Sequence, residues 1–284
     1  MIIERPALYL VGTPIGNLDD FSPRAVEILS ECDFVAAEDT RVAAKLMSVF
    51  DIHKPSVSYF EHNAAQRGPE IIEKLKSGQC CALVTDAGMP AISDPGEALV
   101  KLCAENDIPV HSVPGPSAVV TALAMSGLST SRFTFEGFLS VNKKSRMEHL
   151  ELIKDEYRTM VFYEAPHKLR KTLRDFAQTF GDERKISICR ELTKLHEEVI
   201  RTTCAGAYDL YKNTEPRGEF VLVVEGKQTE KTPEISLEDV ADAIRERYLS
   251  LIAEGMGKAD AMKQTATEFG RTRNEIYPIC MRKD

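Results

Sequence analysis

Five short apolar runs divide the first 116 residues of the chain, and segments with helical periodicity lie between them. Each run is continuously apolar rather than alternating, as is typical of strands buried on both faces of a parallel sheet. The predicted strands span residues 7–11, 34–37, 56–60, 80–85 and 110–113. Strands that alternate with helices predict a doubly wound α/β domain, whose ligands bind at the carboxyl ends of the strands.

The segments between these strands carry the features of helices. Ser22 and Pro23 fit an N-cap and a first helical residue, and apolar positions then recur on one face. Residues 70–76 and the segment around Leu99 predict two further helices. Residues 117–125 are apolar on every side, so they form either a buried helix or part of a subunit interface.

The pattern changes between about residue 132 and residue 226, where only two strong helices, 144–153 and 166–180, separate the strands. This predicts a second α+β domain with a mixed sheet, and its strands span 133–139, 159–163, 185–189, 197–203 and 219–224. The polar stretch 226–233 has the composition of a linker. Three helices follow at 237–253, 258–269 and 272–279, and Pro278 cuts the third one short. We therefore expect a doubly wound α/β domain at 1–118, an α+β domain at 119–228 and a helical domain at 234–284.

Composition narrows the classes of function. The net charge of this 284-residue chain is −8, so any binding of nucleic acid must depend on local basic patches. No apolar run approaches the ~20 residues of a membrane span, and the start of the chain lacks a signal-peptide layout. We therefore expect a cytoplasmic protein that does not contact a membrane. The seven cysteines are scattered and form no Cys-x-x-Cys pair, which argues against disulfides and a metal site.

Three loops that follow predicted strands are unusual. Residues 12–18 contain glycine but match neither a dinucleotide fingerprint nor a P-loop, and they form either a ligand loop or a tight structural turn. Residues 86–96 hold two aspartates, two glycines and two prolines, which favours a rigid loop that a ligand can approach closely. A carboxylate there suits a ribose diol or an ammonium group, and S-adenosylmethionine offers both; two consecutive turns are the alternative. In the third loop, 114–118, the amides at the start of a helix are free to bind a ligand.

Ionisable residues follow two other strands. Glu38 and Asp39 come after the second strand, and His62 comes after the third. Parallel strands present their carboxyl ends at one edge of a sheet, so these groups lie near the unusual loops. Either Glu38 or Asp39 is equally well placed to cap the helix that follows.

Nine segments occur in one order along the chain and together resemble the tetrapyrrole-methylase superfamily of S-adenosylmethionine enzymes. More closely, they resemble its bacterial members that methylate the 2′-hydroxyl of a cytidine in the decoding centre of 16S ribosomal RNA. The segments are GTPIGNL (12–18), AAEDTR (36–41), HN (62–63), VTDAGMPAISDPG (84–96), VPGPSA (113–118), EGFL (136–139), FYEAPHK (162–168), RELTK (190–194) and GEFVLVVEG (218–226). Ser140 and Lys168 depart from the pattern, where proline and arginine are usual.

The resemblance implies the two-domain α/β fold of the class III methyltransferases, with a small helical C-terminal domain and a homodimeric assembly. It also implies S-adenosylmethionine as the cofactor, folded into the cleft between the two α/β domains. Carried over by position, the cofactor-binding residues are Thr13, Pro14, Gly16, Asp86, Ala87, Gly88, Pro90, Ser117, Ala118 and Tyr163.

Methyl transfer to a ribose hydroxyl is an in-line displacement that requires alignment and an acceptor for the hydroxyl proton. The leaving group is a neutral thioether, so the reaction does not require a metal. The favoured proton acceptors are Glu38, Glu164 and His62, each of which follows a strand within a matching segment; Asp39, His167 and Arg190 are further candidates. The alternative role for each is to hold a loop or to contact RNA phosphates.

Contact with 16S rRNA or the small ribosomal subunit requires positive charge. The predicted RNA-binding residues form two groups, Lys143, Lys144 and Arg146 in one, and His167, Lys168, Arg170, Lys171 and Arg174 in the other. In the second group, four of the residues share one face of a helix whose other face is apolar, which fits either RNA contact or a solvated surface.

Two rival functions remain open. The first is a methylase of the same superfamily that acts on a tetrapyrrole or a protein side chain. The second is a non-catalytic RNA-binding assembly factor. The basic helix and the helical tail favour RNA as the substrate, and the full set of strand-end loops favours an enzyme.

Overall fold

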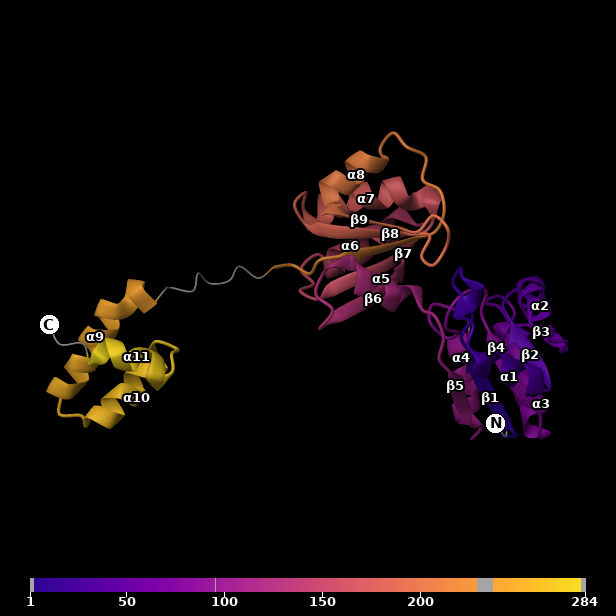
Figure 1. Ribbon diagram of the computed structural model, residues 1–284, viewed down its shortest axis with the longest axis horizontal. Coiled ribbons are helices and arrows are strands. Elements are labelled where there is room, and N and C mark those ends of the chain that lie inside the picture. The colour runs from indigo at the N-terminus through magenta and orange to yellow at the C-terminus, as the bar shows by residue number, and fades with distance from the viewer. Residues whose placement is uncertain (1–2, 95, 229–236, 282–284) are drawn as a thin grey trace. The chain divides into compact units, whose positions relative to one another are not determined.

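The computed structural model describes residues 3–94, 96–228 and 237–281. The chain divides into two compact units, Met1–Lys227 and Gln228–Asp284 (Figure 1). Pro95, in the unusual loop 86–96, and residues 229–236, in the predicted linker and at the start of the predicted helical domain, lie outside the described residues. Among the described helices, none combines the length and apolar character needed to cross a membrane.

The first unit begins with a wholly parallel sheet in the strand order β3-β2-β4-β1-β5. All five predicted strands are confirmed, although the third and fourth end one or two residues early. Their bounds are Ala7–Val11 (β1), Phe34–Ala37 (β2), Ser56–Ser58 (β3), Cys80–Val84 (β4) and Val110–Val113 (β5). The two faces of this sheet pack on separate apolar cores, which explains why the runs are continuous rather than alternating.

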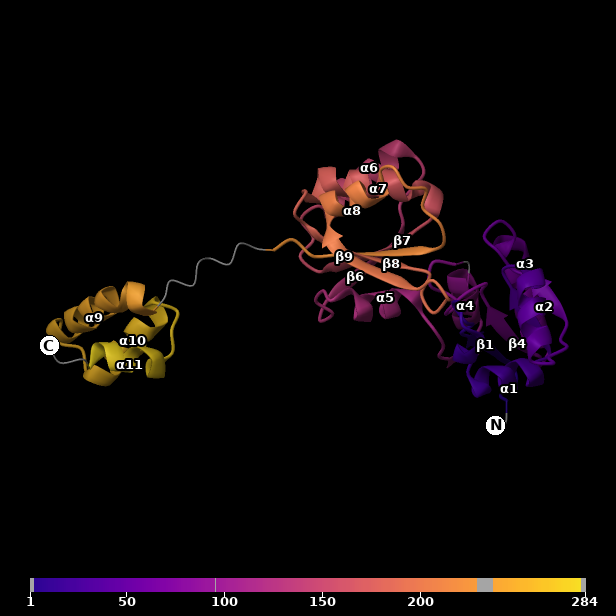
Figure 2. The same cartoon turned by 45° about the horizontal axis from the view of Figure 1, so that its top comes forward.

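Helices cover both faces of the parallel sheet (Figure 2). On one face lie α1 (Pro23–Glu31) and α2 (Thr40–Val49), and on the other lie α3 (Ala64–Lys76) and α4 (Gly96–Glu105). This arrangement confirms the doubly wound prediction. The predicted helix 70–76 was too short, because α3 begins six residues earlier, at Ala64, and contains Pro69. Gly68 packs so closely against α4 that a Cβ there would lie 2.6 Å from the Leu102 side chain. This packing offsets the helical hydrogen bond that Pro69 cannot donate.

The neighbouring strands β1 and β4 form the point where the winding of the sheet reverses, since their following helices, α1 and α4, pack on opposite faces. A ligand crevice is expected beyond the carboxyl ends of such a strand pair. Past these ends the loops after β1 and β4 pair through two backbone bonds between Thr13 and Gly88, of 2.9 and 3.1 Å. The two loops therefore form one structure.

The second sheet of this unit is mixed, as predicted, in the order β6-β7-β10-β8-β9. Only β6 and β7 run parallel, and the other pairs are antiparallel. The strands are Phe133–Phe138 (β6), Thr159–Glu164 (β7), Lys185–Arg190 (β8), Glu198–Thr203 (β9) and Phe220–Val224 (β10).

Three helices, α6 (Lys143–Ile153), α7 (Pro166–Phe180) and α8 (Cys204–Tyr211), cover one face of the mixed sheet, and α5 (Ala118–Ser126) covers the other. We did not predict α8, because it is short and contains a glycine. Packing against α7 and a cap from the Thr203 hydroxyl stabilise it. α5 buries Val119 and Leu123 against the sheet and leaves Val120 53% exposed.

The second unit consists of α9 (Leu237–Ala253), α10 (Lys258–Glu268) and α11 (Arg273–Cys280) around an apolar core of its own. Thr272 and Glu275 form a capping box at the start of α11. The third helix, predicted at 272–279, is confirmed to within one residue at each end, and Pro278 lies inside it because α11 continues to Cys280, which is buried in the core of this unit. The domain boundaries at residues 118, 228 and 234 stay a prediction.

Candidate active site

A cavity of about 440 Å³ lies where the carboxyl ends of the parallel strands face one end of the mixed sheet. At that end β6 and β7 terminate and the antiparallel β10 begins. The parallel sheet and its loops contribute Ile15, Glu38, residues 85–89 and 92–94, Ser117 and Ala118. The mixed sheet contributes Phe138, residues 163–166, Leu192 and residues 219–221. The cavity therefore forms at the place that the doubly wound fold predicts for a ligand.

The loop after β4 is held by one carboxylate. Asp94 accepts hydrogen bonds from the backbone amides of Gly96 (2.7 Å), Ala91 (2.9 Å) and Ile92 (3.3 Å). These bonds hold Ala91 and Ser93 in the left-handed region, at φ 68° and 61°, which residues with a side chain rarely adopt. The loop is thus both strained and fixed, and its fixed backbone forms a wall of the cavity.

Two further carboxylates face the cavity from the parallel sheet. Glu38 accepts a hydrogen bond from the Thr85 hydroxyl (3.0 Å), and Asp86 accepts one from the backbone amide of Asp39 (3.3 Å). Burial raises the pKa of Glu38, and the negative charges of Asp86 and Asp94 raise it further. Burial also raises the pKa of Asp86. A cation in this cavity would relieve the repulsion between these carboxylates.

The rest of the cavity wall is largely apolar. Ile15, Leu192 and Val221 line it and belong to one apolar cluster, with Tyr163 packed against them. Ser117 precedes α5 without a side-chain cap bond, so backbone amides at the start of this helix can donate hydrogen bonds to a ligand. The cavity thus combines an acidic wall, an apolar wall and a group of backbone donors.

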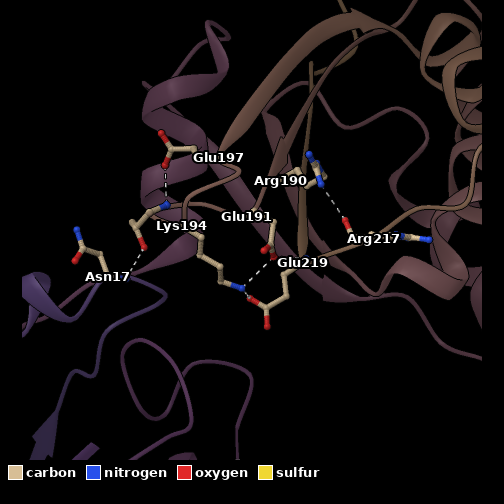
Figure 3. A network of polar contacts seen from close by, with 8 residues as sticks. Asn17, Arg190, Glu191, Lys194, Glu197, Arg217 and Glu219 are labelled. Carbon is tan, nitrogen blue, oxygen red and sulfur yellow. Dashed lines mark hydrogen bonds and ion pairs between the residues drawn. The ribbon is translucent and has the colours of Figure 1, made fainter. Parts of the chain in front are cut away.

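A loop of the mixed sheet closes over the loop after β1 (Figure 3). The backbone amide of Asn17 donates to the Thr193 hydroxyl at 3.0 Å, and the Lys194 ammonium bonds the carboxylates of Glu191 (3.0 Å) and Glu219 (2.8 Å). The close-up shows Lys194 pointing between these two carboxylates, which come from separate segments of the chain. This ion-pair cluster fixes the position of Leu192 and Glu219 on the cavity wall.

Gly16 lies directly beneath this loop. A Cβ at this position would lie 2.5 Å from the Lys194 side chain and 2.7 Å from the Thr193 hydroxyl. A second cavity of about 360 Å³ shares Ile15, Asp86, Ala87 and Glu219 with the large one. Its lining also includes Pro14, Gly16, Lys45 and Lys194. Gly16 is therefore required for close contact between the two loops.

The predicted cofactor residues fall into three groups. Six line the large cavity, namely Asp86, Ala87, Gly88, Ser117, Ala118 and Tyr163. Pro14 and Gly16 line the second cavity instead. Thr13 and Pro90 line neither: the Thr13 hydroxyl is buried and donates within the protein, to the carbonyls of Thr85 and Gly88. Thr13 thus supports the loop through its own hydrogen bonds.

The three favoured proton acceptors differ in position. Glu38 and Glu164 line the large cavity from opposite sheets, whereas His62 is exposed, lies outside its lining and packs edge-on against Phe60. Asp39 takes the capping role, because its carboxylate accepts from the backbone amide of Arg41 at 2.8 Å. The Arg41 guanidinium and amide beside it lower the pKa of Asp39 to about 2.

The predicted RNA-binding residues are mostly exposed. Lys143, Lys144, His167, Arg170, Lys171 and Arg174 are exposed, and Lys168 is half-buried. Arg146 is a correction: only 2% of its surface is exposed, and its guanidinium bonds Asp175 and Thr172 inside the protein. It cannot contact RNA, because Leu150 and Ile153 place that face of α6 against the core.

Several lining residues were not predicted individually. Asp94 belonged to a loop that we singled out, and its position next to a helix start was the available indication. Phe138, Leu192 and Glu219 come from three separate parts of the mixed sheet, and no spacing in the sequence brings them together.

The described residues contain no group of three or more histidine, cysteine or acidic side chains that could hold a metal ion. All seven cysteines are buried free thiols. Burial raises the pKa of Cys32 and of Cys204 to about 12, which disfavours the reactive thiolate. The thiols therefore act as small apolar side chains.

Comparisons with known proteins agree on one family. The sequence model of the tetrapyrrole (corrin/porphyrin) methylases matches residues 7–207. A Synechocystis sp. protein named ribosomal RNA small subunit methyltransferase I is 45% identical over 274 residues, 96% of this chain and 97% of the relative. A protein of the same name from Thermotoga maritima is 46% identical over 221 residues, 78% of this chain and 99% of the relative. The solved structure of a diphthine synthase shares the fold, with a TM-score of 0.63 at 16% identity over 79% of this chain and 91% of its own.

Proposed function

Because this chain belongs to the tetrapyrrole (corrin/porphyrin) methylases, we propose that it methylates the ribose 2′-hydroxyl of a cytidine in the decoding centre of 16S ribosomal RNA. The chain is a methyltransferase, and its methyl donor is S-adenosylmethionine. Family membership also confirms the predicted class III α/β fold with a helical C-terminal region. The substrate, the target atom and the site residues are our proposals.

The lining of the large cavity suits the chemical groups of S-adenosylmethionine. The cofactor carries a sulfonium and an ammonium cation, which suit the carboxylates of Glu38 and Asp86. Its carboxylate suits the free amides at the start of α5, after Ser117. Its adenine suits the apolar wall around Ile15 and Val221. We assign cofactor binding to these residues and to the backbone of residues 86–88.

The cofactor supplies an electrophilic methyl group whose departure leaves a neutral thioether. The protein must hold the acceptor hydroxyl in line, keep water out and accept one proton. The loop held by Asp94 and the ion-pair cluster around Lys194 fix the two sides of the cavity, which meets the positioning requirement. Glu38 and Glu164 are the two predicted acceptors whose side chains reach it.

The observation that carries the choice of substrate is the 45% identity, over 96% of this chain, to a relative named as a small-subunit rRNA methyltransferase. The exposed cations of α7 support it, because phosphate contacts supply much of the affinity for RNA. We further propose that the enzyme is a cytoplasmic homodimer. We also propose that the boundaries between its three domains lie at residue 118 and at residues 228–234.

The proposed function is tested by mapping the methyl group. The full chain is incubated with labelled S-adenosylmethionine and small ribosomal subunits that lack the modification. We expect label on one cytidine ribose of the 16S RNA. Label on a base, or no label on RNA, would reject the 2′-hydroxyl assignment, and label on a tetrapyrrole or protein would favour another substrate class.

The basic face of α7 is tested with a charge-removal variant, Arg170→Gln/Lys171→Gln/Arg174→Gln. Because each lost phosphate contact lowers the salt slope by roughly one, we expect kcat/KM for the subunit to fall about tenfold with a weaker salt dependence. The matched control removes three exposed cations elsewhere, Lys76, Lys101 and Lys212. Equal losses in both variants would contradict a specific RNA contact on α7.

Cofactor binding should depend on pH in the direction set by Glu38 and Asp86. Their raised pKa values mean that they protonate at a higher pH than free carboxyls, and a neutral carboxyl no longer attracts a cation. The Kd for S-adenosylmethionine should therefore rise as pH falls from about 7 to about 5, where the cofactor's own groups scarcely titrate. Without cofactor, the same raised values make the folded state bind protons more readily than the unfolded chain, so these two groups favour folding as pH falls.

Calorimetry across this pH range measures the effect. The variant Glu38→Gln/Asp86→Asn should bind about tenfold or more weakly and lose the pH dependence, since both titrating groups are gone. A wild-type Kd that stays constant with pH, or a variant that keeps the full pH dependence, would show that Glu38 and Asp86 do not bind the cofactor.

A further inference from the structure

Behind the large cavity, Glu164 ends a chain of buried polar contacts. It lies at the end of β7, only 4% exposed, yet it lines the cavity. One carboxylate oxygen accepts the backbone amide of Ala165 at 2.9 Å, and the other accepts a short hydrogen bond from the Thr172 hydroxyl on α7. The carboxylate is therefore fixed at two points while it faces the cavity.

Arg146 sets the direction in which the Thr172 hydroxyl donates its hydrogen bond. The Arg146 guanidinium donates to the Thr172 oxygen at 2.8 Å and to the Asp175 carboxylate at 2.6 Å. A guanidinium is a donor only, so it occupies an acceptor position of Thr172 and leaves the hydroxyl proton to be donated onward. The acceptors in reach are the Glu164 carboxylate and, at 3.3 Å, the carbonyl of Lys168. Arg146 thus directs the Thr172 proton toward Glu164.

Behind Glu164 the buried charges are paired. The Asp175 carboxylate pairs with the guanidinium of Arg146 at 2.6 Å, and both side chains are buried. Buried charges are costly unless they are paired and hydrogen-bonded, and the Arg146–Asp175 pair therefore holds Thr172 firmly in place. The Glu164 carboxylate is held by hydrogen bonds, from Ala165 and Thr172. On the parallel-sheet side, the carboxylates of Asp86 and Asp94 lie close enough to Glu38 to raise its pKa, which suits that side of the cavity to binding a cation.

We propose that Glu164 is the group that accepts the proton of the substrate hydroxyl, and that Arg146 and Thr172 are positioning residues that hold it in place; this rests on the proposed function. As the methyl–oxygen bond forms, the methyl–sulfur bond breaks and sulfur keeps its electron pair. The hydroxyl proton passes to a remaining lone pair of the Glu164 carboxylate. The products are a methyl ether, a neutral thioether and a neutral carboxyl group, which later releases its proton to water.

Three variants test this assignment. Glu164→Gln keeps the size of the side chain and removes its basicity, so kcat should fall at least about a hundredfold. Thr172→Val keeps the shape and removes the hydroxyl, so kcat should fall about tenfold because the carboxylate loses its fixed orientation. Thr172→Ser restores a hydroxyl at the same place and should recover most of the wild-type kcat. In all three, KM for the subunit and Kd for S-adenosylmethionine should stay within about twofold of wild type.

Thermal unfolding distinguishes a positioning role of Thr172 from a purely structural one. If Thr172 only stabilises the fold, Thr172→Val will lower Tm while kcat per folded molecule stays unchanged, which overturns the positioning role. A Glu164→Gln enzyme with wild-type kcat overturns the proton-acceptor role. If the wild type methylates an RNA base, the choice of ribose fails while these comparisons still decide the role of Glu164. If it methylates no RNA, the inference fails together with the proposed function.

Discussion

Replacing Asp94 with alanine should weaken S-adenosylmethionine binding by about a hundredfold or more while leaving both sheets folded. The carboxylate bonds three backbone amides, and each such charge-assisted bond is worth about 1.5–3 kcal/mol. Without it nothing offsets the left-handed conformations of Ala91 and Ser93, which cost about 1–3 kcal/mol each. The loop should then relax and displace the cavity wall that residues 86–89 and 92–94 form. Calorimetry measures the affinity, and circular dichroism checks the fold.

Asp94→Asn is the matched control for this prediction. Both of the shorter bonds, to Ala91 and Gly96, end on the same oxygen, Oδ1, which an asparagine can keep as its carbonyl oxygen. The asparagine variant should therefore retain most of the affinity. If Asp94→Ala and Asp94→Asn weaken binding equally, the charge of Asp94 rather than the geometry of the loop determines the affinity for the cofactor. If neither weakens it, the loop is not a cofactor loop.

The parallel sheet could be predicted because its physical basis is local. Strands such as β4 are buried on both faces, so they read as continuous apolar runs, and Ser22 caps α1 where the sequence indicated. The helices that were misplaced depend on distant packing. α3 runs through Pro69 beside α4, and α8 depends on its contact with α7. Such contacts leave no periodic pattern in the sequence.

Half of the candidate site could be predicted for the same reason. The carboxyl ends of parallel strands share one edge, so Glu38, Asp86 and Ser117 were expected together and do line one cavity. The other half comes from a mixed sheet, where strand order is not implied by chain order. Leu192 and Phe138 reach the cavity only through that order.

Arg146 shows how a cation can be misread. It lies among polar residues at the start of α6, which favoured a surface role. Its spacing of four and seven residues from Leu150 and Ile153 places it on their face of the helix, and all three are buried. The spacing was visible in the sequence, but its ion-pair partner, Asp175, lies 29 residues away on another helix. A buried arginine requires such a partner, and only the fold supplies it.

The variant Gly12→Ala should destabilise the first unit by about 3 kcal/mol, which lowers Tm by roughly 6–12 °C in a unit of this size. A Cβ at Gly12 would lie 2.6 Å from the Gly115 Cα and 2.8 Å from the Gly115 nitrogen. These are backbone atoms, so no rotamer change can relieve the overlap. The loops after β1 and β5 must separate, and the cofactor cavity between Ile15 and Ser117 opens with them. Calorimetric unfolding measures the loss.

The pair of glycines also predicts a coupling. A Cβ at Gly115 would lie 2.8 Å from the Gly12 Cα, so either alanine forces the same separation of the two loops. Once the first substitution has separated them, the second meets less resistance, and the double variant should be less destabilised than the sum of the single variants. Gly257→Ala, in the second unit and with no atom closer than 3.7 Å to its Cβ, is the control and should leave the unfolding of the first unit unchanged. Strict additivity would mean that the two alanines act at independent places, and the contact between these loops would then not be what fixes the cavity.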